Sequence, residues 1–233
     1  PRFAVGGVGS GSANAFPLIT RLDIDERRPE NDNLLAFDGR VINPPFLFGA
    51  GGVELLGREM TADLQALRAE ALAHPNNWIP LRSKGVDFGS IRCNRHGDCN
   101  TTRVNGVDED LVVRPFGPKG QYISTRDYHR QAVQYQQGIH PVDEFGYIHD
   151  DGDGVSAELS IGHLSLLSIY LTTMERPEVK PATGAAARGQ ALFDDVGCTG
   201  CHVPFLDTRS RHLGLAHPEA VTDPSANVYY TVD

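Results

Sequence analysis

The sequence predicts a mainly α-helical, loop-rich protein with few short strands. Two observations lead to this fold class. Apolar residues recur at helical spacing in two stretches, 54–73 and 160–175. The 233-residue chain also contains 25 glycines and 15 prolines, which favour turns and loops between short regular elements. A chain of this length can bury a core as one large or two small domains.

The expected elements begin with an irregular to strand-like region over residues 1–50, where glycine-rich turns surround short apolar runs. A helix is expected over 54–73, closed by His74 and Pro75. Residues 75–125 are expected to be loop-rich, with short strand candidates, notably EDLVVRPF, residues 109–116.

Three further helices are expected in the second half of the chain. The helix over 125–137 ends at Gly138, and the helix over 160–175 begins with Ser160 as its cap. A proline-containing linker, residues 177–183, then leads to a last helix over 184–196.

Charge and hydropathy exclude two classes of partner. The formal net charge is −9, and a nucleic-acid-binding surface requires a basic cluster, which the sequence lacks. No apolar run approaches the roughly 18 residues that a membrane-spanning helix needs. We therefore expect neither nucleic-acid binding nor a membrane span.

The motif CTGCH places two cysteines three residues apart with a histidine directly after the second: Cys198, Cys201 and His202. C-x-x-C-H is the pattern for covalent haem c attachment, because two thiols on one turn reach the vinyl groups and the imidazole reaches the iron. A redox dithiol would need a strand-to-helix setting, whereas here a helix precedes the motif. A zinc site would need two more ligands, and Cys93 and Cys99 are poorly spaced for that role.

The helix before the motif supports the haem interpretation. Gly189, Phe193 and Val196 share one face of it, where a small residue allows close packing and an aromatic side chain can cover the haem edge. Haem c is attached outside the bacterial cytoplasm, so we expect a periplasmic protein. In such an oxidising compartment, Cys93 and Cys99 are expected to form a disulfide that closes a short loop.

Four blocks of sequence carry a family resemblance: PPFLFGAGGVELL, LVVRPFGPKGQYISTRDYHRQAVQYQQGIHP, DDGDGVSAELSIGHLSLLSIYLTTMERP and ARGQALFDDVGCTGCHVPFL. In this order, between Pro44 and Leu206, they resemble the di-haem oxidoreductase family, distant relatives of the bacterial di-haem cytochrome c peroxidases. The resemblance implies cytochrome c-like haem domains with two haems, one oxidising a substrate such as hydrogen peroxide and the other relaying electrons.

The chain has a single C-x-x-C-H, which corresponds to the second motif of that family. We therefore expect residues 1–176 to form the region between the haems, 177–233 to form part of the C-terminal haem segment, and the first motif to lie upstream of Pro1. The expected function is electron transfer through this haem, with peroxide or substrate oxidation at a second haem outside the chain. The alternative is a mono-haem electron-transfer or structural subunit of a larger complex. The partner is a redox protein or a second haem domain.

The ligand on the far side of the iron stays open at this point. His202 is the expected proximal ligand, and a histidine or methionine opposite it would favour electron transfer over catalysis. The distal candidates are His163, His217, His212 and Met174. His129 and His140 are more typical of structural or surface histidines.

An acidic loop offers a second cofactor site. Asp151 and Asp153 follow the D-x-D-G spacing of calcium loops, and Glu158 lies nearby, so the three are candidate Ca²⁺ ligands. The alternative is an acidic turn that stabilises the start of the helix at Ser160.

Overall fold

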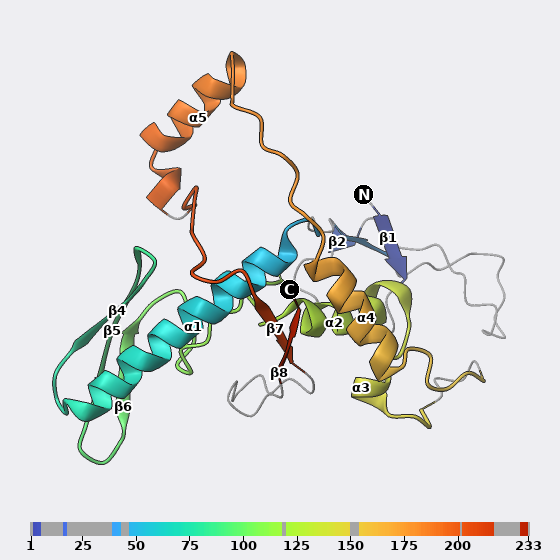
Figure 1. The fold of residues 1–233 in the computed structure, drawn as a ribbon, viewed down its shortest axis with the longest axis horizontal. Helices are drawn as coiled ribbons and strands as arrows, with labels where there is room; N and C mark the ends of the chain where they lie inside the picture. The colour runs from blue at the N-terminus through green and yellow to red at the C-terminus, as the bar shows by residue number, and fades with distance from the viewer. Residues whose placement is uncertain are drawn as a thin grey trace. The chain divides into compact units, whose positions relative to one another are not determined.

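The computed structural model describes residues 2–5, 16–17, 39–42, 47–117, 120–149, 154–200, 202–216 and 229–232 (Figure 1). The chain divides into two compact units, and each unit combines two separate stretches of sequence. Unit 1 comprises Pro1–Leu47 and Phe116–Thr173, and unit 2 comprises Phe48–Pro115 and Met174–Asp233. The sequence predicts another division, at 176/177, between the region that separates the two haems and the C-terminal haem segment. That division stays a prediction.

Unit 2 is built on one long helix and a three-stranded sheet. Helix α1 spans Ala50–Ala73, four residues longer at its start than expected. Strands β4 (Ile79–Ser83), β5 (Val86–Cys93) and β6 (Cys99–Val104) form an antiparallel sheet in sequence order.

The core of unit 2 lies between α1 and this sheet. Leu64 from the helix and Leu81 and Ile91 from the strands have no exposed surface, and full burial of such a side chain contributes roughly 1.5–3 kcal/mol. The buried cluster consists of Met60, Leu64, Ala71, Leu81, Phe88, Ile91, Cys93 and Leu111. This core holds α1 in a fixed register on the strands, which positions the polar network described below.

The strand positions differ from the expectation for residues 75–125. The regular strands lie at 79–104, whereas 109–116, expected as a strand, is irregular apart from a single bridge at Phe116. Asp110 turns the chain there, because its carboxylate accepts the backbone N–H of Val112 at 3.0 Å. The next N–H, that of Val113, donates to Thr61 Oγ1 at 2.9 Å, so a helix side chain takes the place of a neighbouring strand.

Two short connections shape the sheet. Ser83 pairs with Val86, and Lys84 and Gly85 between them both have positive φ (50° and 83°), the requirement for a two-residue hairpin turn. The second hairpin is closed by the disulfide between Cys93 and Cys99, which confirms that predicted pairing. The free cysteine among the described residues is Cys198.

Unit 1 contains the helices α2 (Thr125–Gln137), α3 (Val142–Phe145) and α4 (Ile161–Thr172). Strands β1 (Arg2–Val5), β2 (Phe16–Pro17) and β3 (Gly39–Ile42) form a small sheet with β3 in the middle. Helix α2 packs against α4.

The caps confirm both predicted boundaries of α2 and the predicted start of α4. Ser124 Oγ accepts the backbone N–H of Asp127 at 3.0 Å, and Gly138 ends α2 in the left-handed conformation, with φ of 70°. Ser160 Oγ likewise accepts the N–H of His163 at 3.2 Å and starts α4. α4 ends at Thr172, three residues before the expected 175.

The remaining elements belong to unit 2. They are α5 (Ala185–Asp195), the short 3₁₀ helix η1 (Cys198–Gly200) and the paired strands β7 (Leu213–Ala216) and β8 (Tyr229–Val232). Helix α5 lies within the range predicted for the last helix. None of the helices in the described part of the chain is both long and apolar enough to cross a membrane.

Candidate haem-attachment site

The CTGCH motif follows directly from the end of α5. Gly197 donates its N–H to the carbonyl of Asp194 at 3.0 Å, and η1 begins at Cys198. The N–H of His202 donates to the carbonyl of Cys198 at 2.9 Å, so the described thiol and the imidazole belong to one hydrogen-bonded turn. Cys201 lies outside the described residues.

An aromatic ring from α5 lies against the imidazole. The ring centroids of Phe193 and His202 are 5.7 Å apart, with an angle of 60° between the rings. Because 185–195 is helical, Gly189, Phe193 and Val196 share a face as expected, and this face leads to His202. A side chain at Gly189 would meet no atom within 4 Å, so the space beside it is open.

Large apolar side chains on both sides of the motif are exposed. The exposed fraction is 65% for Val196, just before Cys198, and 83% for Phe205, just after His202. Leu192, Phe193 and Val203 in the same segment are exposed as well. Large apolar side chains that are exposed together mark an interaction or ligand-binding site. A flat, largely apolar macrocycle attached at Cys198 fits these residues.

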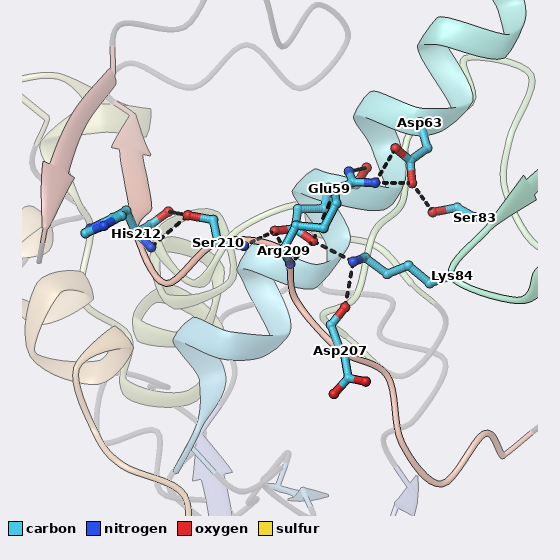
Figure 2. A network of polar contacts seen from close by, with 8 residues as sticks. All are labelled: Glu59, Asp63, Ser83, Lys84, Asp207, Arg209, Ser210 and His212. Atoms are coloured by element: carbon cyan, nitrogen blue, oxygen red, sulfur yellow. Dashed lines mark hydrogen bonds and ion pairs between the residues drawn. The ribbon is translucent and has the colours of Figure 1, made fainter.

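The chain after the motif is held against α1 and the β4–β5 turn by a network of polar contacts (Figure 2). Glu59 accepts the backbone N–H groups of both Arg209 and Ser210 at 2.9 Å. We call residues 207–212 the docked segment. It begins five residues after His202, so this network fixes the chain that leaves the haem motif.

A buried lysine completes the environment of Glu59. Lys84 Nζ lies 2.5 Å from Glu59 Oε2 and donates to the carbonyl of Asp207 at 2.6 Å, and both charged side chains are less than a tenth exposed. Burial raises the pKa of Glu59, but the hydrogen bonds from Lys84 and from the two backbone N–H groups outweigh it. The pKa of Glu59 therefore lies below its ordinary value.

Arg209 forms the outer part of the network. Its guanidinium contacts both carboxylate oxygens of Asp63, at 2.8 and 3.0 Å, and Asp63 also accepts a hydrogen bond from Ser83 Oγ. Within the docked segment, Ser210 Oγ accepts the N–H of His212 at 3.0 Å. Sequence analysis did not find this network, because its partners lie up to 151 residues apart.

The distal-ligand candidates occupy different places. His163 is exposed on α4 of unit 1, and His212 is exposed in the docked segment of unit 2. Met174 of unit 2 is half-buried, and its carbonyl accepts the N–H of Gly49 at 2.9 Å. His217 lies outside the described residues. The distal ligand stays an open prediction.

The calcium site also stays a prediction, because Asp151 and Asp153 lie outside the described residues. Glu158 is engaged elsewhere: its carboxylate accepts the backbone N–H of His140 and lies 3.7 Å from the ring nitrogen Nδ1 of the same residue. Within the described ranges, no group of three or more His, Cys, Asp or Glu side chains is arranged to hold a metal ion.

His129 on α2 is a buried histidine whose setting the sequence did not reveal. It is 6% exposed, and neither ring nitrogen has a hydrogen-bond partner among the described residues. Burial lowers the pKa of His129 from 6.5 to about 4, and the nearby carbonyl of Thr125, outside hydrogen-bond geometry, opposes this shift only in part. The folded protein therefore holds this imidazole neutral.

Because the imidazole of His129 is neutral in the folded state, we expect unit 1 to lose stability as the pH falls. Because the folded pKa is below the unfolded one, the contribution of His129 is fully present above pH 6.5 and is lost as the pH falls toward 4. The loss amounts to about 3 kcal/mol over that window. Urea unfolding between pH 7.5 and 5 measures the part of this loss that falls above pH 5, about 2 kcal/mol. His129→Leu should flatten the slope of stability against pH, while the exposed control His163→Gln should not. Equal slopes in the wild type and His129→Leu would contradict this assignment.

Comparison with known proteins finds no relative of this chain. No family model matches the chain, no curated protein does, and no solved structure does. The resemblance to the di-haem oxidoreductases therefore stays a prediction based on the four sequence blocks.

Proposed function

We propose that this chain is a periplasmic c-type cytochrome that transfers electrons through one haem attached at Cys198 and Cys201. The observation that supports this most strongly is the hydrogen-bonded turn from Cys198 to His202 with exposed apolar side chains on both sides. When bound, the haem supplies an iron that changes oxidation state by one electron.

The roles of the chain's own residues follow from this proposal. Cys198 and Cys201 would hold the haem covalently through their sulfur atoms, and His202 would hold its iron. Phe193, which lies against the His202 ring, would restrict the orientation of that ring. Val196 and Phe205 would exclude water from the haem. The disulfide of Cys93 and Cys99 supports an oxidising compartment, as the periplasmic location requires.

The enzyme form of this proposal places peroxide or substrate oxidation at a second haem outside the chain, as the four sequence blocks imply. The alternative form is a mono-haem electron-transfer or structural subunit, which the single C-x-x-C-H favours. In both forms the partner is a redox protein or a second haem domain, and His202 is the proximal ligand.

A haem count on the natural polypeptide tests the proposal. The pyridine haemochrome spectrum of the protein purified from its source gives the number of haems c per chain. Two haems would support the di-haem enzyme, and peroxide turnover would then be measured. One haem would support the mono-haem subunit. No covalently bound haem would overturn the proposal.

A further inference from the structure

The outer face of the β4–β5–β6 sheet carries two arginines stacked on one tryptophan. The guanidinium carbons of Arg92 and Arg103 lie 4.8 and 4.2 Å from the ring centroid of Trp78. Both arginines are exposed, while Ile91 and Cys93 on either side of Arg92 are buried in the core. Stacking on an aromatic ring restrains a guanidinium and leaves the N–H groups at its edge free to bind.

No side-chain hydrogen bond or ion pair joins Arg92 or Arg103 to another described residue. Arg68 and Arg95 also have none, so the stacking on Trp78 is what distinguishes these two arginines. In the described part of the chain, the arginines that do hold a carboxylate are Arg58, Arg82, Arg114, Arg126, Arg130 and Arg209.

Arg92 also lines a hollow of about 430 Å³ beside the disulfide. The volume suits a small molecule. Apart from Arg92 and the two cysteines, the lining is made of amide and hydroxyl side chains and one carboxylate: Asn76, Asn94, Asn100, Thr101, Thr102 and Asp98. Arg103 does not line it, although it stacks on the same tryptophan.

Several polar groups in the hollow keep N–H groups available to a ligand, beside the single carboxylate, Asp98. The side-chain oxygen of Asn100 already accepts the N–H and the hydroxyl of Thr102, at 3.0 and 2.7 Å, which leaves its NH₂ group to donate. Asn94 is occupied on both sides, since its oxygen accepts the N–H of Asp98 and its NH₂ donates to the carboxylate of Asp98. With Arg92 added, the hollow favours a ligand rich in acceptors and negative in charge.

We propose that this hollow binds a small hydroxylated molecule that carries an oxyanion, about the size of one sugar ring. Arg92 binds the oxyanion, and Asn100 and Thr101 bind hydroxyl groups. A carboxylate and a phosphate share the chemistry that a guanidinium recognises, so both are sources of the oxyanion. This site lies outside the haem motif and does not rest on the proposed electron transfer.

Titration calorimetry on the full chain with three sugars tests the proposal. D-Glucuronate and D-glucose 6-phosphate carry the two oxyanions, and D-glucose is the neutral control. We expect at least one anionic sugar to bind about tenfold more tightly than glucose, as a charged hydrogen bond predicts. Tighter binding of glucuronate assigns a carboxylate, and tighter binding of the phosphate assigns a phosphate. Binding of neither anion, or equal binding of glucose, would overturn the proposal.

Matched variants distinguish binding of the anion in this hollow from its attraction to any arginine on the surface. Arg92→Gln should weaken binding of the preferred anion about tenfold or more. Arg103→Gln removes the same charge from the same tryptophan but not from the lining, and it should change the affinity less than about threefold. Asp98→Asn removes a negative charge from the lining and should strengthen anion binding without affecting glucose. Equal losses in the two arginine variants would contradict a site centred on Arg92.

Discussion

Replacing Cys198 and Cys201 together with serine is expected to remove all covalently bound haem from the chain. The hydroxyl of serine does not form the thioether that links a c-type haem, so haem staining of the polypeptide on a denaturing gel should disappear. The structure gives this change a local reason, because Cys198 is the free thiol of the turn that carries His202. The measurement is the stain together with the absorbance of the purified variant.

Two controls make this result specific. The double variant Cys93→Ser with Cys99→Ser breaks the disulfide of the β5–β6 hairpin and should keep the haem stain. His202→Ala should keep the stain too but change the absorbance spectrum, because the thioethers remain while the iron loses its imidazole. A retained stain in the variant without Cys198 and Cys201 would exclude this motif as the attachment site.

Replacing Glu59 with glutamine is expected to destabilise unit 2 by about 3–5 kcal/mol, because it leaves the buried ammonium of Lys84 without a counter-charge. Glutamine also has one acceptor oxygen where the carboxylate has two, so it cannot hold the N–H groups of Arg209 and Ser210 and face Lys84 as well. Urea unfolding gives the stability, and hydrogen exchange of the two amides reports release of the docked segment.

An exposed ion pair supplies the control for Glu59. Asp87 pairs with Arg82 on the sheet surface, both side chains are more than half exposed, and Asp87→Asn should therefore change the stability far less than Glu59→Gln. The pKa of Glu59 is lowered, so its contribution is present above its ordinary pKa of 4.5 and is lost as the pH falls through the lowered value. A change below 1 kcal/mol in Glu59→Gln, with protected amides, would show that the network does not hold the segment.

The parts of this molecule that sequence predicts well are those with local causes. Ser124, Gly138 and Ser160 act on atoms within a few residues of themselves, and the helix boundaries they indicate agree with the structure. Strands β4 and β5 also had a local signal, since Lys84 and Gly85 form a two-residue turn between apolar runs. That turn lies in residues 75–125, for which the sequence predicts loops and short strand candidates without placing this hairpin.

In the candidate site, too, some features have local causes and others depend on residues that are far apart in the sequence. The turn from Cys198 to His202 is a local pattern and could be predicted. The contact of Glu59 with Arg209 joins residues 150 positions apart, and no periodicity or motif links them. His129 lies on a strongly polar helix, where spacing alone gives no reason to bury an imidazole without a partner. These features depend on tertiary packing, which a single sequence does not reveal by its patterns.

The interleaving of the two units has a consequence for the order of folding during synthesis. The chain starts unit 1, builds α1 and its sheet for unit 2, returns to complete unit 1 and only then supplies Met174–Asp233. Glu59 and Lys84 are therefore synthesised before their partners in the docked segment. The amides at 209 and 210 leave the ribosome about 125 residues after Lys84. Neither unit can be cut out of this sequence as one continuous fragment, and the segment that follows Cys198 acquires its contacts with α1 only after Glu59 and Lys84 have been made.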